Sequence, residues 1–248
     1  MNVVYILWLR QLKRSSRSKA RIVASFGQPL LFLLAFGFGF GPVFSRAGQG
    51  NYIQFLAPGV IGMSILFTAI FAGIEVIWDR QFGFLKETLV APVPRILIML
   101  GRTLGGATVA VMQGILVFVL CLLVGFRPVT LALVPLALLY MLLTALLFTA
   151  VGTALGSAMP DFQAFQLVMN FLVMPIFFLS GALFPLTNVP RALRIVAGID
   201  PLSYSVDGLR QSLIGAVHFG VPLDVAVLSC VTAAALVLGA YAFSKIQV

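Results

Sequence analysis

Charged residues are rare in this sequence. Only 9% of its 248 residues are charged, 61% are hydrophobic, and the mean hydropathy is +1.10. A water-soluble domain of this length needs far more polar surface to cover its core. The composition therefore excludes a soluble globular protein and indicates a polytopic membrane protein with a single domain over residues 1–248.

Cysteine and histidine are equally scarce. The two cysteines, Cys121 and Cys230, lie inside apolar runs, and His218 is the one histidine. None of them has a partner at metal-ligand spacing, so the sequence predicts no metal site. We expect both thiols to be small buried groups that pack between helices.

The motifs of common enzymes are missing. There is no Gly-x-x-x-x-Gly-Lys-Ser/Thr phosphate loop, no Gly-x-Ser-x-Gly elbow and no His-Glu-x-x-His pair. Acidic residues are scarce in the apolar runs as well. Glu75 lies one turn from the end of its run, where we expect an interfacial residue and not a proton carrier. The sequence therefore predicts no enzyme, no bound cofactor and no energy source within this chain.

Six long apolar runs follow one another along the chain. Each has about 20 residues or more, which is enough to cross a hydrocarbon core of ~30 Å at about 1.5 Å per residue. They are continuous, whereas barrel strands alternate apolar and polar residues. We therefore predict an all-α membrane protein. Its six transmembrane helices are expected at residues 22–44, 55–78, 103–126, 129–155, 164–184 and 223–244.

The first segment, residues 1–21, has the pattern of an amphipathic helix lying in the membrane interface. One face carries basic residues that we expect to reach anionic headgroups, and the other carries an apolar strip. A cleaved signal peptide is the alternative, although its basic residues precede the apolar core and do not follow it. The basic face is Arg10, Arg14, Arg17 and Arg21, and the apolar strip is Val4, Trp8 and Leu12.

The basic residues also predict the orientation. With the amino terminus inside, the cytoplasmic side receives Arg10, Lys13, Arg14, Arg17, Lys19, Arg21, Arg80, Lys86, Arg95, Arg102 and Lys245. The outside receives Arg46, Arg127, Arg191, Arg194 and Arg210. Both termini are thus expected in the cytoplasm of a prokaryotic cell, with the chain in the plasma membrane. This asymmetry, together with attraction to lipids, explains the net charge of +9 without nucleic-acid binding.

Residues 185–222 contain two helical pieces that are apolar enough to enter the membrane and too short to cross it. Asp200 can cap a helix that has Pro201 at its first position, and Asp207 and Arg210 are spaced to pair on one face. We expect a re-entrant helical hairpin on the external side; two helices resting on the outer surface are the alternative. The residues assigned to these external helices are Pro190, Arg191, Arg194, Asp200, Pro201, Tyr204, Asp207 and Arg210.

Residues 79–102 form the one long charged segment between apolar runs. The pattern Asp79-Arg80…Gly83…Lys86-Glu87…Leu89…Ala91-Pro92-Val93-Pro94-Arg95 resembles the cytoplasmic coupling segment of type-2 ATP-binding-cassette (ABC-2) permeases, in the drug-exporter branch. The resemblance covers the whole chain, including Ser180 to Leu186 and Asp200-Pro201-Leu202-Ser203-Tyr204. Two departures are Gln81, where an acid is common, and Asp200, where Asn is common.

The resemblance implies a permease that works as two copies with a separate cytoplasmic ATPase subunit, which uses ATP and Mg. The charged loop would dock in a cleft of that ATPase. The implied coupling residues are Asp79, Arg80, Phe82, Gly83, Phe84, Leu85, Lys86, Glu87, Pro92, Pro94 and Arg95. The alternative is that these charges simply solvate a connecting loop.

The cargo is less sharply indicated. Span faces rich in Phe, Leu and Met, without charged cavity residues, favour export of a hydrophobic or amphipathic drug, antibiotic or lipid-like molecule. Export of a lipid-linked glycan is the alternative, since Tyr52, Tyr140, Tyr204 and Trp78 can stack on sugars or else form interfacial belts. A non-transporting membrane anchor or regulatory subunit and an ion-coupled carrier are alternatives of other classes.

Overall fold

The computed structural model describes residues 3–17, 19–48, 50–84 and 93–244, and within these ranges it is helical with no β-strand. The helices of the first half are α1 (Val3–Arg17), α2 (Lys19–Arg46), α3 (Tyr52–Phe71), α4 (Ile74–Gln81) and α6 (Arg95–Val124). Those of the second half are η1 (Leu131–Leu133), α7 (Val134–Ala158), α8 (Phe162–Val168), η2 (Met169–Val173), α9 (Met174–Leu179), η3 (Leu186–Asn188), α10 (Arg191–Ile199), α11 (Pro201–Ile214) and α12 (Val221–Ser244).

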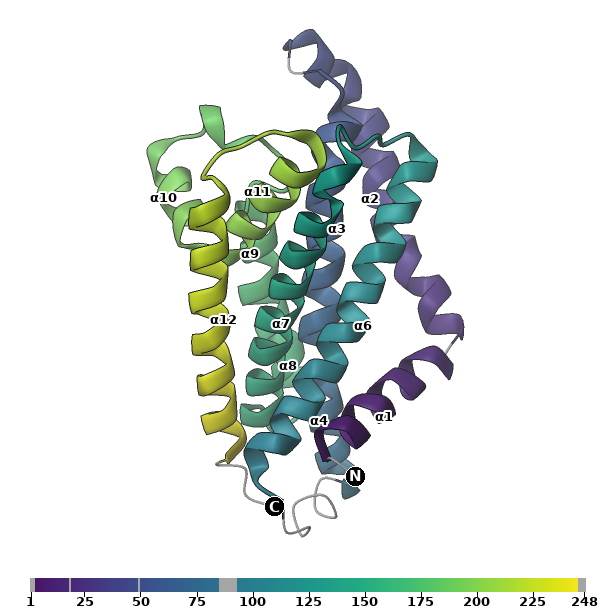
Figure 1. The fold of residues 1–248 in the computed structure, drawn as a ribbon, viewed down its shortest axis with the longest axis vertical. Helices are drawn as coiled ribbons and strands as arrows, with labels where there is room; N and C mark the ends of the chain where they lie inside the picture. Colours follow the sequence, from purple (N-terminus) through teal and green to yellow (C-terminus); the bar gives the residue numbers. More distant parts are fainter. Residues whose placement is uncertain (1–2, 18, 49, 85–92, 245–248) are drawn as a thin grey trace.

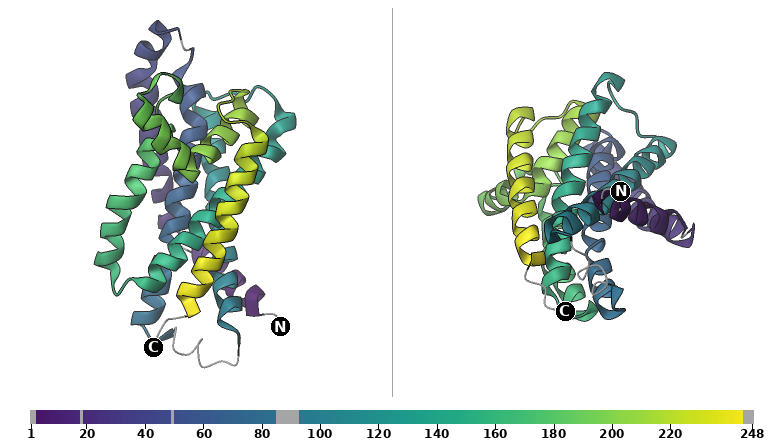
Figure 2. Two further views of the ribbon diagram at one scale, coloured as in Figure 1. Left: turned by 90° about the vertical axis from the view of Figure 1, so that its left-hand side faces the viewer. Right: turned by 60° about the horizontal axis from the view of Figure 1, so that its bottom comes forward.

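In the described part of the chain, six stretches are long and apolar enough to cross a membrane, which confirms the number expected from the sequence. They are Ser25–Arg46, Tyr52–Gln81, Arg95–Val124, Leu131–Ala158, Phe162–Leu179 and Val221–Phe243. Figure 1 shows them as a bundle, with the start of α1, α4 and the end of α12 together at its lower end. We call this lower end the termini end. Helices α10 and α11 lie at the opposite end (Figures 1 and 2).

Helix α3 is the centre of the bundle, and it approaches α7 very closely. Most of its side chains are buried, and it packs against α2, α6, α7 and α11. Where α3 passes into α4, Gly73 lies directly against the backbone of Gly152 and Gly156 on α7. A side chain at any of these three positions would overlap a backbone carbonyl, so only glycine permits this contact. The contact fixes α4 against the end of α7.

Helix α1 crosses α6 near the termini end (Figure 1). Gly101 and Gly105 on α6 face it, and a β-carbon there would lie 2.9 Å from the Leu7 Cβ and 2.6 Å from the Gln11 Cβ respectively. The indole Nε1 of Trp8 donates to the Thr108 hydroxyl at 3.0 Å. Small residues on α6 therefore allow α1 to lie directly on it.

One of the two cysteines departs from expectation. Cys121 is buried, as predicted, but Cys230 is exposed. Helix α12 packs on α7, α11 and α6 along one side only, and Cys230 lies on the uncovered side, beside the exposed Ser229. Apolar sequence does not distinguish the two faces of such a helix, because lipid is as apolar as a protein core.

Helices α10 and α11 form as the sequence predicts, and α11 lies inside the protein. The Asp200 carboxylate caps α11 by accepting from the Leu202 amide at 2.9 Å, Pro201 is the first helical residue, and Gly215 ends the helix with φ 72°. Nearly all of α11 is buried, against α3, α7 and α12. The position of this pair relative to the membrane stays a prediction.

The prediction that Asp207 and Arg210 form an ion pair is wrong. The Asp207 carboxylate accepts from the amides of His218 at 2.9 Å and Phe219 at 2.7 Å, whereas Arg210 donates to the carbonyls of Gly181 at 2.8 Å and Ala182 at 3.1 Å. Non-helical backbone inside a membrane protein needs internal partners. The Asp207 carboxylate and the Arg210 guanidinium each supply such a partner to the backbone outside the helices.

The cap at Asp200 generates a pH-dependent prediction. Burial raises the pKa of Asp200 from 3.8 to about 7, although the bond from Leu202 acts the other way. The unfolded chain ionises at the lower value, so the folded protein loses stability as the pH rises between these two values. Asp200→Asn keeps the capping oxygen and removes the charge.

We therefore expect the thermal midpoint of Asp200→Asn in detergent to exceed that of the wild type by an amount that grows with pH up to about 7 and then stays constant. Unfolding curves between about pH 5 and pH 8 measure this difference. A difference that does not change with pH would show that Asp200 ionises normally in the folded state. Asp200→Ala, which removes the charge and also loses the cap, is expected to be about 1 kcal/mol less stable than Asp200→Asn.

Candidate functional site

A buried acidic residue at the termini end joins three helices. Asp79 on α4 is only 7% exposed, and its Oδ2 lies 2.6 Å from the Nη2 of Arg102 on α6. Its Oδ1 lies 3.1 Å from the Nη2 of Arg10 on α1. A carboxylate at this depth is stable only when it is paired. The pairing therefore holds α1, α4 and α6 together.

Two further charges complete this group. Arg14 lies 3.6 Å from the Glu75 carboxylate and 3.9 Å from that of Asp79. We call the five residues Arg10, Arg14, Glu75, Asp79 and Arg102 the Asp79 cluster. Three arginines and two acids leave it with one excess positive charge. Arg10 and Arg14 turn toward the acids of α4, and their expected contact with lipid headgroups stays a prediction.

Arg80 also has an internal partner. Its Nη2 donates to the Gly156 carbonyl at 3.2 Å and also to the Met159 carbonyl, both at the end of α7. The last carbonyls of a helix have no partner within it and carry partial negative charge, which a guanidinium satisfies. Arg80 thus fastens α4 to α7, and its expected part in docking stays a prediction.

The loop that follows α4 begins with an exposed aromatic residue. Phe82 is 83% exposed, and Gly83 turns the chain with φ 79°. The Phe84 ring lies under the Arg10 guanidinium, with 3.7 Å between Cζ and the ring centroid. Of the remaining expected coupling residues, Pro94 and Arg95 are exposed at the start of α6. Leu85, Lys86, Glu87 and Pro92 lie outside the described residues.

Helix α6 begins earlier than the sequence indicates. Residues 95–102 were expected in the charged loop, but they form the first turns of α6. Arg102 is thereby placed on the buried side of that helix, opposite Asp79. The basic residues at 95 and 102 hide this extension, because an apolar run predicts only the part of a helix that lies in hydrocarbon.

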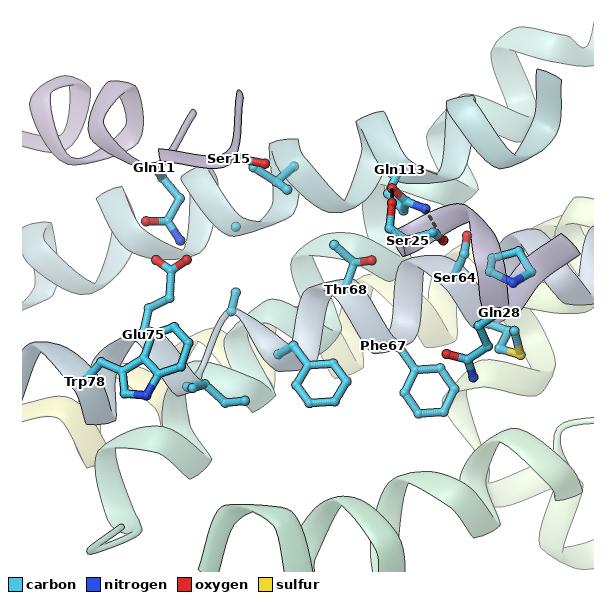
Figure 3. Close-up of a pocket in the computed structure, with 17 residues that line it drawn as sticks. Gln11, Ser15, Ser25, Gln28, Ser64, Phe67, Thr68, Glu75, Trp78 and Gln113 are labelled. Atoms are coloured by element: carbon cyan, nitrogen blue, oxygen red, sulfur yellow. Dashed lines mark hydrogen bonds between the residues drawn. The ribbon is translucent and has the colours of Figure 1, made fainter. Parts of the chain in front are cut away.

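A cavity of about 400 Å³ adjoins the Asp79 cluster. It lies between α1, α2, α3, α4 and α6, and Figure 3 shows polar side chains facing it from several of these helices. Glu75 and Trp78 line one end, and Gln28 and Gln113 line the other. The expectation of a cavity without charged residues is therefore wrong at the Glu75 end.

The tyrosines considered for sugar stacking are not available for it. Tyr140 is fully buried, the Tyr52 hydroxyl donates to the Leu183 carbonyl at 2.8 Å, and the Tyr204 hydroxyl donates to that of Gly198 at 2.7 Å. These rings pack within the protein near the opposite end. Trp78 alone of the four lines the cavity.

Sequence reasoning missed two features. Neither the pairing of Arg10 and Arg102 with Asp79 nor the acidic residue Asp224 was identified. Asp224 lies in the last expected span and is fully buried, and its carboxylate has no hydrogen-bond partner among the described residues. An acid in the first turn of an apolar run was the available signal for Asp224.

The Asp79 cluster predicts an order of stabilities. Asp79→Asn leaves three arginines close together with one acid, and breaking a buried pair typically costs about 3–5 kcal/mol. Arg10→Met is expected to cost less, because Asp79 keeps Arg102 and the Arg10 side chain is 34% exposed. Arg17→Met, an exposed arginine of the same helix, is the control. Thermal unfolding in detergent tests the order, and equal effects of Asp79→Asn and Arg17→Met would contradict it.

Comparison with known proteins identifies the family of this chain. The family of ABC-2 type transporters matches residues 2–214. Nodulation protein J of Rhizobium leguminosarum bv. trifolii is 30% identical over 219 residues, which are 85% of this chain and 78% of that protein. The inner membrane transport permease YadH of Escherichia coli K12 is 29% identical over 212 residues, which are 84% of this chain and 82% of that protein. With six candidate spans and a match over most of its length, this chain belongs to the ABC-2 type transporter family as a transport permease.

Proposed function

We propose that this permease is the membrane subunit of an ATP-binding-cassette exporter. It would move a hydrophobic or amphipathic molecule out of the cell with energy from ATP, which a separate subunit binds and hydrolyses with Mg. The observation that carries the proposal is the exposed Phe82, at the start of a loop whose base is fixed by the Asp79 cluster. Membership of the family supports it.

The termini end faces the cytoplasm in this proposal. Described basic residues gather there, whereas fewer lie at the opposite end, and cytoplasmic loops carry the excess of Lys and Arg. Those on the helices that meet at the termini end are Arg10, Lys13, Arg14 and Arg17 on α1, Arg80 on α4, and Arg95 and Arg102 at the start of α6. The loop between α4 and α6 is then on the side where ATP is available. We place the protein in the plasma membrane of a prokaryotic cell, in contact with its lipids.

The contacts of α4 suggest how a push on the loop reaches the spans. Ion pairs bind α4 to α1 and α6, and the Arg80 bonds and the Gly73 contact bind it to α7. Packed helices with such contacts shift together and do not deform independently. The ATPase would thus bias a two-state equilibrium of the permease. Two permeases and two ATPase subunits would form the complete exporter.

A drug, an antibiotic or a lipid-like molecule is the proposed cargo, because the cavity joins apolar and aromatic walls with few charges. A glycan carried on a lipid is the second candidate, and the hydrogen-bonding groups of the cavity favour it. A hydrolysis-dead ATPase subunit tests the energy source. Export that continued with such a subunit would contradict ATP coupling and favour an ion-coupled carrier, and a chain without any export would be an anchor or regulator.

Docking through Phe82 is tested with matched phenylalanines. Phe82→Ala is expected to weaken binding of the ATPase encoded beside this gene by about 30-fold, because an anchoring aromatic at an interface is worth about 2 kcal/mol. Phe171 is equally exposed, at 81%, but lies in η2 among residues expected to face lipid. Phe171→Ala should therefore leave both affinity and stimulated ATP hydrolysis unchanged.

Affinity is measured with both proteins purified and the permease in lipid nanodiscs. If Phe82→Asp binds the ATPase and stimulates hydrolysis like the wild type, Phe82 does not dock. The paired change Arg80→Glu and Glu87→Arg would not test docking alone. Arg80→Glu also removes the bonds to the end of α7.

A further inference from the structure

Loop docking does not account for the cavity beside the Asp79 cluster. It has walls from five helices and a volume of about 400 Å³, which is within the range of ~300–1,000 Å³ typical of ligand sites. Its lining alternates apolar and hydrogen-bonding side chains. The polar members are Gln11, Ser15, Ser25, Gln28, Ser64, Thr68, Glu75 and Gln113, and the larger apolar ones are Met63, Phe67, Phe71, Ile74 and Trp78.

The polar groups form a row along the cavity. Ser64 and Thr68 are one helical turn apart on α3, and Glu75 continues the row on α4 toward the Asp79 cluster. Figure 3 shows the Thr68 hydroxyl facing the space between α3 and α6, with Gln11 opposite Glu75 at one end and Gln28 at the other. The aromatic rings of Phe67 and Trp78 lie beside this row (Figure 3).

Part of this row has no partner in the protein. Ser25 and Gln113 bond each other at 2.8 Å, and the Ser64 hydroxyl donates to the Ile61 carbonyl at 2.8 Å. By contrast, four side chains make no hydrogen bond among the residues that the structure describes, namely Gln11, Ser15, Gln28 and Thr68. Gln28 and Thr68 lie within candidate spans, where unpaired polar groups are unfavourable. These groups therefore suit a partner that brings its own hydrogen bonds.

The charges restrict the chemistry of that partner. Among the residues that the structure describes, no charged side chain lines the middle of the cavity, and the only lining carboxylate is Glu75, which Arg14 approaches to 3.6 Å. Arg14, which lies beside Glu75, disfavours a cation at that end. An anion would meet the Glu75 carboxylate. An uncharged molecule avoids both conflicts.

We propose that the cavity binds an uncharged amphipathic molecule with several hydroxyl or amide groups along one side and an apolar body on the other. Its polar groups bond to Gln11, Gln28 and Thr68, and its apolar side packs on Phe67, Phe71 and Trp78. Binding follows from the cavity alone, and only the assignment of this molecule as cargo rests on the proposed function.

Tryptophan fluorescence provides a direct test, because Trp78 lines the cavity and Trp8, the other tryptophan, does not. Trp8→Phe leaves Trp78 as the single reporter in full-length protein in lipid nanodiscs. The probe is an alkyl glucoside with a brominated chain, which quenches tryptophan on contact. We expect saturable quenching by this glucoside and only weak, non-saturable quenching by a brominated alkyltrimethylammonium ion of the same chain length.

Variants of the row then identify the site. Thr68→Val and Gln28→Leu should each raise the half-saturating glucoside concentration by up to about tenfold, since each removes a hydrogen bond. Thr68→Ser, which keeps the hydroxyl, should restore the affinity. Ser229→Ala, on the exposed side of α12, is the control and should have no effect.

Equal, non-saturable quenching by both probes would overturn the proposal and show that ordinary lipid fills the cavity. The proposal would also be overturned if Thr68→Val bound the glucoside with the affinity of the wild type. Neither result depends on an ATPase subunit. If the glucoside fails to bind while the permease still stimulates its ATPase partner, this inference is wrong and the proposed function stands. If the glucoside binds but no ATPase associates, the proposed function is wrong.

Discussion

The carboxylate of Asp79, held between Arg102 and Arg10, is the interaction on which the arrangement of the termini end depends. Removing charges from water costs several kcal/mol for each ion, so a buried carboxylate remains stable only where its partners are fixed. Here the partners come from two other helices, α1 and α6. One ion pair network therefore determines where the amino-terminal helix lies and how α4 leaves the bundle.

The remaining contacts of α4 do not involve charge pairs, yet they have the same consequence. Gly73 touches the backbone of α7 at Gly152 and Gly156, and Arg80 binds the carbonyls at the end of α7. Between these attachments α4 has little freedom to move alone. Helix α4 is attached to α7 near both of its ends and to α1 and α6 along its sides, and the exposed Phe82 follows it directly. Glu75 lies on this helix and lines the cavity, so a shift of α4 would change that end of the cavity.

Much of the fold could be predicted from the sequence because membranes impose simple rules. Continuous apolar runs predicted six spans, and Asp200-Pro201 predicted where α11 begins, since capping depends on neighbours in the chain. Pairing over long distances could not be predicted in this way. Asp79 and Arg10 are 69 positions apart, and helical periodicity placed Arg10 on a polar face without identifying what that face meets.

Residues that are close together in the sequence also led to a wrong prediction where contacts with other parts of the fold replaced the expected one. Asp207 and Arg210 are spaced as a helical ion pair, but each binds nearby irregular backbone instead. Likewise, Cys121 and Cys230 lie in similar apolar runs, and only packing decides that one is buried and the other exposed. The cavity is assembled from five helices, and no single segment indicates it.

Distances between spin labels test directly whether α1 and α4 move as one body. Labels on the exposed Ser16→Cys and Gln81→Cys, in a Cys121→Ala and Cys230→Ser background, report on α1 and α4, and Gln81→Cys with Ile199→Cys reports on α4 and α10. The measurement is made with and without the ATP-loaded ATPase partner, and labelled chains are diluted with unlabelled ones. We expect the distance from 16 to 81 to stay narrow and unchanged while the distance from 81 to 199 shifts. A distance from 16 to 81 that broadens or shifts while that from 81 to 199 stays constant would contradict the coupling of α1 to α4 through Asp79.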